Sequence, residues 1–151
     1  LKGFTLVELV ITIAIVIILS VISVPIYRGY VTKAMYSEGY ALLGTILSAQ
    51  KAYYSEYGNF LSGSNGYNAT TSFEPTLNID ARGNKYFSKF HTGTNTGNCK
   101  FYFHAGLFKP EELIKAGKGK LFIQYNITKG AKFVEGEDSN GSLDSSWYSA
   151  S

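Results

Sequence analysis

The chain has 151 residues, enough for one domain with a core of its own. It carries 14 Lys and Arg against 11 Asp and Glu, and this net charge of +3 is spread along the sequence without a basic block. This distribution allows nucleic acid or an anionic surface as a partner and points to neither. DNA binding is not expected, because it needs a basic stripe or groove. The single cysteine, Cys99, excludes an intrachain disulfide in this sequence, and we expect it to be a small buried apolar residue.

An apolar run dominates the N-terminal part of the sequence. No charged side chain occurs from Leu9 to Tyr27. About 20 apolar helical residues, rising ~1.5 Å each, cross a hydrocarbon core of roughly 30 Å, so the run is long enough to span a bilayer. A secretory signal peptide would end in a small-residue cleavage site, whereas the small residue here, Gly3, precedes the run. Lys2 on the same side predicts a cytoplasmic N-terminus.

One acidic residue, Glu8, stands at the head of this run. An ionised carboxylate costs a few kcal/mol inside a membrane, so an acid at this depth is a functional hypothesis by default. Alternatively, Glu8 lies at the headgroup level or stabilises the helix N-terminus through the helix dipole. Composition alone leaves both interpretations open.

The residues around Glu8 also carry a resemblance. The stretch "KGFTLVEL", with Gly3 before Phe4 and Glu8 four residues after it, resembles the cleavage and methylation motif of type IV pilins and type II secretion pseudopilins. Pro25, Tyr27 and Tyr30 stand at the spacing from Phe4 that this family shows in its N-terminal helix, and "ALLGTILSAQKAYYSEYGNF" is similar to the helix half that follows.

The resemblance implies a processing and assembly site. A membrane peptidase, the prepilin peptidase, would cut between Gly3 and Phe4 and methylate the new amine of Phe4, which makes residues 1–3 the remnant of a leader. Glu8 would then be the counter-charge for such an amine in a neighbouring subunit, since a buried charge is tolerable only when paired. Pro25 would kink or locally unwind the helix segment before it. The partners implied are further copies of the chain in a helical homopolymer, the membrane before assembly, and the pilus assembly machinery.

The expected fold class is α+β, a pilin-like roll. Apolar residues at three- and four-residue spacing, such as Ala34, Ala41, Leu42 and Ile46, predict one helix over about residues 4–57 that stops at Gly58. Its second half would pack on an antiparallel sheet of three or four strands. The strands are predicted at 85–91, 98–105, 120–128 and 131–135, after a strandless connection over 61–78 and with a short helix over 110–117.

In domain terms, residues 4–25 would form the transmembrane and filament-core helix, and residues 26–151 the globular pilin domain. In the strand predicted at 120–128, alternation predicts one buried and one exposed face, with Phe122, Gln124 and Asn126 on the second. Lys129-Gly130 predicts a tight turn into the next strand.

The acidic C-terminal tail offers oxygen ligands that suit Ca²⁺, although their spacing does not match an EF-hand. We favour a solvated tail over a calcium site, and no metal site is firm. Asn-X-Ser/Thr sequons are weak hints of glycosylation. The calcium ligands would be Glu137, Asp138, Asn140 and Asp144, and the sequons lie at Asn68, Asn126 and Asn140.

Enzymatic activity is not expected. The sequence has two histidines, His91 and His104, of which we expect His104 to be a residue of the sheet, and it has no nucleophile elbow, phosphate loop or metal-spaced cluster. We interpret the chain as the structural subunit of a type IV pilus for adhesion or motility, in the bacterial inner membrane before assembly and extracellular afterwards. The alternatives are the major pseudopilin of a type II secretion system, or a filament specialised for DNA uptake or electron transfer.

Overall fold

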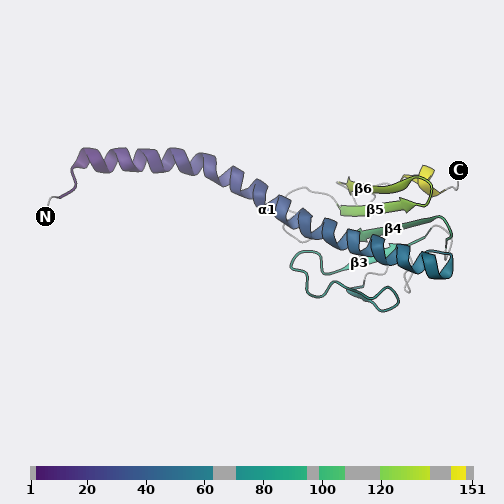
Figure 1. Cartoon of the computed structure of the whole chain (residues 1–151). Helices are drawn as coiled ribbons and strands as arrows, with labels where there is room; N and C mark the ends of the chain where they lie inside the picture. Colours follow the sequence, from purple (N-terminus) through teal and green to yellow (C-terminus); the bar gives the residue numbers. More distant parts are fainter. Residues whose placement is uncertain (1–2, 63–70, 95–98, 108–119, 137–143, 149–151) are drawn as a thin grey trace. The chain divides into compact units, whose positions relative to one another are not determined.

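The computed structural model describes residues 3–62, 71–94, 99–107, 120–136 and 144–148. The chain divides into two compact units, Leu1–Met35 and Tyr36–Ser151, and helix α1 (Leu6–Tyr57) runs through both (Figure 1). In the described residues α1 is followed by six strands and one short 3-10 helix. They are β1 (Phe73–Glu74), β2 (Ile79–Asp80), β3 (Phe90–Gly93), β4 (Tyr102–Leu107), β5 (Lys120–Asn126), β6 (Gly130–Gly136) and η1 (Ser145–Tyr148).

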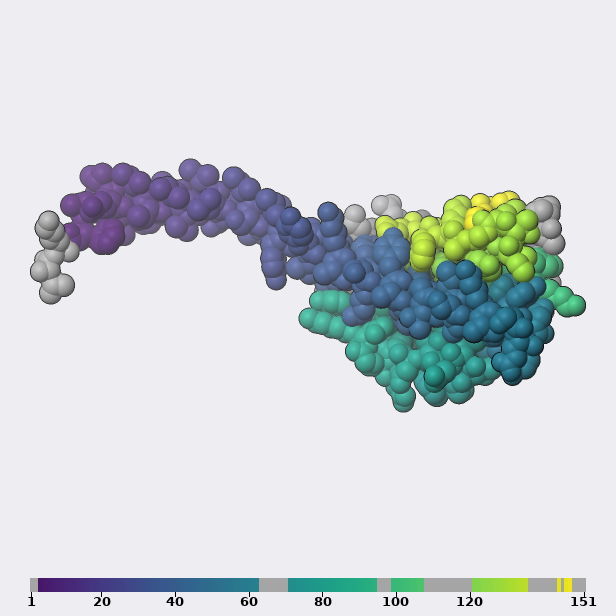
Figure 2. All heavy atoms as spheres, in the orientation of Figure 1, coloured from purple at the N-terminus to yellow at the C-terminus, as the bar shows by residue number. Residues whose placement is uncertain are grey.

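Most of the first unit is the N-terminal part of α1, which is exposed from Leu6 to Tyr30 and is coloured purple to blue in Figure 2. Three hydroxyls in its apolar stretch donate to carbonyls of the preceding turn: Thr12 to Leu9, Ser20 to Val16 and Ser23 to Leu19, at 2.7–2.8 Å. These bonds satisfy all three donors within the helix, which suits an apolar environment. Within the described residues, α1 is the one helix long and apolar enough to cross a membrane.

The second unit contains a four-stranded antiparallel sheet in the order β3-β4-β5-β6. The register of β5 on β6 pairs Asn126 with Gly130, whose φ of 86° makes the tight turn expected at this place. The predicted α+β class, with a long helix and an antiparallel sheet, is confirmed.

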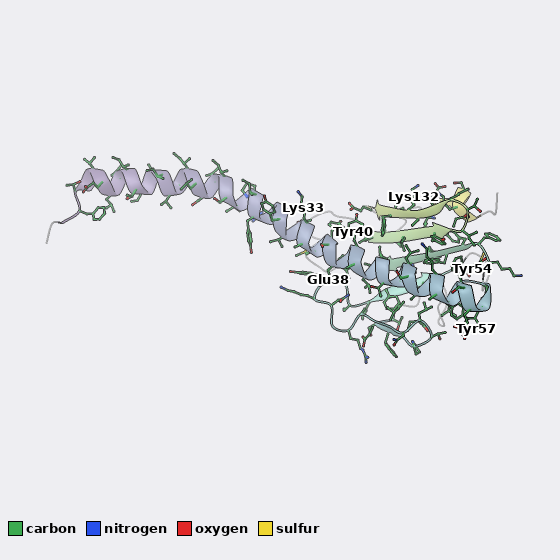
Figure 3. All side chains as sticks on the ribbon, in the orientation of Figure 1. Lys33, Glu38, Tyr40, Tyr54, Tyr57 and Lys132 are labelled. Atoms are coloured by element: carbon green, nitrogen blue, oxygen red, sulfur yellow. The ribbon has the colours of Figure 1, made fainter. Side chains whose placement is uncertain are left out.

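One face of this sheet packs on the C-terminal part of α1. Leu43 and Ile46 are fully buried, and Gly39 lies so close to the sheet that an added Cβ would be 2.7 Å from Leu121 Cδ2. The Tyr40 hydroxyl donates a hydrogen bond to the Glu135 carboxylate of β6 (Figure 3). The predicted packing of helix on sheet is therefore correct, but the predicted stripe was partly wrong. Ala34 and Ala41 are exposed, whereas Met35, Gly39, Leu43 and Gln50 are buried.

The helix ends where the sequence predicted. The amide of Gly58 donates to the Tyr54 carbonyl at 2.8 Å, and Gly58 adopts a φ of 71°. This left-handed conformation is the usual stop of a helix and carries a penalty for residues with a Cβ.

The connection after the helix is not strandless. Phe73 pairs with Asp80 and Glu74 with Ile79, closing a small hairpin through Asn78 at a φ of 51°. Strands of two residues are too short to show an alternating pattern, which is why the sequence did not reveal them. The buried side chains of Leu77 and Ile79 hold the hairpin against the rest of the Tyr36–Ser151 unit.

Strand β5 also differs from its prediction, because both of its faces are covered. Gln124 and Asn126 are fully buried although they were expected on an exposed face. Their amides contact the segment around η1, which follows far along the chain. The helix predicted over 110–117 lies outside the described residues.

Candidate processing and assembly site

The peptide bond between Gly3 and Phe4 lies just before α1 and is accessible. Both residues are exposed, Phe4 by 79%, and no atom lies within 4 Å of the place where a Cβ of Gly3 would be. An exposed, uncrowded backbone of this kind can enter a protease cleft.

Glu8 and Thr5 close a capping box at the start of α1. The Thr5 amide and hydroxyl donate to Glu8 Oε2 at 2.9 and 2.8 Å, and the Glu8 amide donates to Thr5 Oγ1 at 3.3 Å. Reciprocal bonds of this type satisfy donors that a helix N-terminus leaves without partners. Thr5 was not among the predicted site residues, although Thr-x-x-Glu before an apolar run is the signature of a capping box.

In this capping box the Glu8 carboxylate points back toward Thr5. In the uncleaved chain Glu8 is therefore bonded to Thr5 at the start of the helix. Pairing of Glu8 with a Phe4 amine stays a prediction, because the Phe4 nitrogen acquires a charge only after cleavage.

The helix that follows is apolar on every side. All large apolar side chains between Leu6 and Ile26 are at least 51% exposed. Removing apolar surface from water gains roughly 25 cal/mol of free energy per Å². This part of the helix is therefore expected to be covered by lipid or by equivalent helices of other copies. Pro25 lies within α1, in this exposed part, and lacks the amide that would bond to the preceding turn.

The proposed calcium ligands fall mostly outside the described residues, which exclude Glu137, Asp138 and Asn140. Asp144 is described, and its carboxylate is already engaged. Oδ1 accepts from the amide and hydroxyl of Ser146 at 3.1 and 2.7 Å, and Oδ2 accepts from Lys132 Nζ at 3.2 Å. The Ser146 hydroxyl and the Lys132 ammonium lower the pKa of Asp144. The described part of the chain has no group of three or more metal-ligating residues.

Of the three sequon asparagines, the structure describes Asn126. Asn126 is fully buried and its amide donates to the Trp147 carbonyl at 2.9 Å, which makes it inaccessible to a glycosyltransferase in the folded chain. Asn68 and Asn140 lie outside the described residues.

The two histidines lie on neighbouring strands, with ring centroids 5.7 Å apart. His104 is 1% exposed, and its ring packs over Gly93 of β3, where a Cβ would meet it at 2.8 Å. Burial, and to a lesser degree His91, lower the pKa of His104 to about 4, so the ring is neutral near pH 7. It fills the sheet face, as the sequence predicted.

Comparison with known proteins gives partial matches. The chain is 47% identical over 57 residues to the fimbrial protein EcpC of Eikenella corrodens, covering 38% of this chain and 37% of that protein. It is 40% identical over 73 residues to a fimbrial protein of Neisseria meningitidis serogroup B, covering 48% and 43% of the two chains. It is 44% identical over 59 residues to the type IV major pilin protein PilE1 of Neisseria gonorrhoeae, covering 39% and 36%.

In each case the matched part spans less than half the length of the curated relative. No family model matches the chain, and no solved structure matches it. The chain is thus similar to fimbrial proteins and to a type IV major pilin over less than half of its length.

Proposed function

We propose that this chain is the structural subunit of a type IV pilus, held in the bacterial inner membrane by α1 and then polymerised into a helical surface filament. The observation that carries the proposal is the N-terminal part of α1, apolar on all sides, exposed and headed by Gly3-Phe4 and Glu8. A surface of that size is not compatible with a monomer in water.

Processing would create a new N-terminal amine at Phe4, just before α1. The prepilin peptidase would hydrolyse the bond between Gly3 and Phe4 with a water molecule, which leaves a carboxylate on Gly3 and an amine on Phe4. A sulfonium methyl donor would then methylate this amine, which gives up a proton. The capping box would stay intact because Thr5 and Glu8 both lie after the cut. The product would carry one positive charge on Phe4 and one negative charge on Glu8.

Assembly would then depend on matching these charges. Inside a bundle of apolar helices a lone ammonium or carboxylate costs several kcal/mol, whereas a pair is tolerated. The Glu8 carboxylate of one subunit and the Phe4 amine of a neighbour would form that pair, and axial positions that leave either charge alone would be penalised.

A secretion pseudopilus would use the same processed head. The names of the matched relatives, two fimbrial proteins and a type IV major pilin, favour the pilus. An extracellular filament is accordingly the proposed final location.

The test separates the two roles open to Glu8. The precursor and its variants are expressed in a pilus-assembling bacterium that lacks its own major pilin, and the filaments are sheared off and weighed. Glu8→Ala removes both the cap and the counter-charge, whereas Glu8→Gln keeps an acceptor suited to a capping box and removes only the charge. We expect both variants to insert in the membrane and both to lose most of the filament yield. Glu56→Ala, an exposed acid near the end of α1, is the control with normal yield.

Mass spectrometry of the wild-type filament should show N-methylated Phe4 as its first residue. Long filaments from Glu8→Gln would contradict the counter-charge, and mature subunits that begin at Leu1 would contradict the processing step. A wild-type chain that stays monomeric without detergent would contradict the proposed function as a whole.

A further inference from the structure

The C-terminal segment Asp144–Trp147 lies against β5 and is attached through side chains of the sheet. The Gln124 side-chain amide donates to the Asp144 carbonyl at 3.3 Å, and its oxygen accepts from the Asp144 amide at 3.1 Å. This two-way bonding of one backbone unit is what a paired strand would supply, but here a side chain supplies it.

Asn126 makes the second attachment. Its Nδ2 donates to the Trp147 carbonyl at 2.9 Å, while its Oδ1 accepts from the amides of Thr128 and Lys129 at 2.8 and 3.2 Å. One side chain therefore closes the turn between β5 and β6 and also holds the segment. Gln124 and Asn126 are both fully buried. The segment that their side-chain amides bind therefore also covers these amides.

Charged groups hold the outer side of the segment. Lys132 of β6, labelled in Figure 3, lies 3.2 Å from Asp144 Oδ2, and Lys129 Nζ donates to the Ser146 carbonyl. The side chains of Lys132 and Asp144 are 45% and 37% exposed, so salt screens this ion pair.

We propose that Asp144–Trp147 is a detachable strap, latched by the Gln124 and Asn126 amides and by the Lys132–Asp144 pair, which opens before the sheet unfolds. Two properties support this. Besides the half-buried Trp147, the strap is bound by hydrogen bonds and an exposed ion pair, whereas the sheet and α1 share a fully buried apolar core around Leu43, Ile46 and Ile123. The chain has a single cysteine, so no internal disulfide fastens the strap.

Local opening of this kind is expected where a segment has few buried apolar contacts. It would uncover the polar face of β5 while leaving the helix-covered face unchanged. The inference does not rest on the proposed function, because it concerns the Tyr36–Ser151 unit alone.

Trp147 makes the strap observable, since it is the single tryptophan of the chain. The full chain in detergent micelles is titrated with urea, and acrylamide quenching of Trp147 is compared with far-UV circular dichroism. We expect quenching to rise at lower urea than the loss of ellipticity, and at still lower urea when salt is raised from 0.05 to roughly 0.5 M, at which the Debye length is well below 10 Å. Coincident transitions at both salt concentrations would overturn the proposal.

Two variants test the latch. Gln124→Met keeps the volume of the side chain and removes both bonds to Asp144, together with the bond that Gln124 Nε2 donates to the Tyr102 hydroxyl of β4 at 3.2 Å. It should accelerate hydrogen exchange of the Asp144 amide roughly tenfold relative to the β4 and β5 amides. Lys132→Met should abolish the salt dependence of quenching without altering the sheet, which keeps the test valid even if Gln124→Met folds poorly.

The matched control is Arg82→Met, which removes another exposed ion pair, Arg82–Asp80, on the β1–β2 hairpin. It should leave Trp147 quenching unchanged. Equal acceleration of exchange at Asp144 and throughout β5 in the Gln124 variant would show that strap and sheet open together, and would also overturn the proposal.

Discussion

At the scale of single residues, Glu38 is the clearest anchor in the Tyr36–Ser151 unit. Its Oε1 accepts from the amides of Tyr86 and Phe87 at 2.7 and 2.8 Å, and its Oε2 accepts from the Lys85 amide at 3.1 Å. One helix carboxylate thus satisfies three successive backbone donors. The same bonds explain why β3 begins at Phe90 and not at Lys85 as predicted, since these amides are not available to a strand ladder.

Glu38→Ala should therefore lower the free energy of unfolding by about 2 kcal/mol, because hydrogen bonds to a charged acceptor are lost and backbone donors are left without it. Urea denaturation of the full chain in micelles measures the change. Glu56→Ala, exposed on the same helix, should change it by less than about 0.5 kcal/mol. Equal stabilities for the two variants would show that water replaces the carboxylate without cost.

At the scale of elements, the contact between α1 and the sheet depends on a missing side chain. An added Cβ at Gly39 would lie 2.7 Å from Leu121 Cδ2 and 2.8 Å from Phe87 Cε2, both closer than real carbon contacts allow. At Gly44, on the same helix, nothing lies within 4 Å of that position. The two glycines thus separate the packing effect from the conformational preference of glycine.

Gly39→Ala should destabilise the chain by about 1–3 kcal/mol through overpacking, in spite of the better helix propensity of Ala. Gly44→Ala should stabilise it by up to about 1 kcal/mol, because only the propensity changes. Thermal unfolding of both variants under the same conditions gives the comparison. Stabilisation by both substitutions would mean that Leu121 and Phe87 move aside freely.

A second element-scale prediction concerns Pro25, and it rests on the proposed filament. In the single chain α1 continues through Pro25. In a tightly packed filament we expect regular hydrogen bonding to be lost between Ala14 and Pro25, since proline lacks a donor and crowds the preceding turn while neighbouring helices supply compensating contacts. A filament map of Pro25→Ala should show the ladder restored. An unbroken ladder in the wild-type filament would contradict the prediction.

At the scale of the whole molecule, stability should depend on pH through His104. Its folded-state pKa is about 4 against an ordinary value of 6.5, and burial is the main cause. Because the unfolded chain takes up this proton first, the contribution of neutral His104 is complete above pH 6.5 and is lost as pH falls toward 4.

The free energy of unfolding should drop by up to about 3 kcal/mol across this interval, because each tenfold difference in proton affinity between the folded and unfolded chain is worth about 1.36 kcal/mol. Urea denaturation at pH 7.0, 6.0, 5.0 and 4.5, roughly the span between the two pKa values, follows the decline. In the His104→Gln variant the free energy of unfolding should no longer fall with pH over this interval. In the His91→Gln variant, which alters the half-buried neighbouring ring, it should fall as in the wild type. A flat wild-type profile would show that water reaches the His104 ring.

Several parts of the molecule could be predicted because their signals are local in the sequence. Apolar residues from Leu9 to Val24 determine a helical stretch long enough to cross a bilayer. Gly58 ends helix α1, and Gly130 forms the turn between β5 and β6. Thr5 and Glu8 belong with these signals, since the capping box joins residues three positions apart. The processing motif around Gly3 and Phe4 is local as well.

Only the tertiary structure decided which residues of the C-terminal part of α1 face the sheet, where β3 begins, and that the second face of β5 is covered. The bonds responsible join residues far apart in sequence: Glu38 reaches amides 47–49 positions away, and Gln124 and Asn126 reach the strap 20 and 21 positions away. A polar residue such as Gln124 is expected to be exposed when only its neighbours in the sequence are considered. It is buried because a distant backbone satisfies its amide, and burial of a polar group depends on finding such a partner.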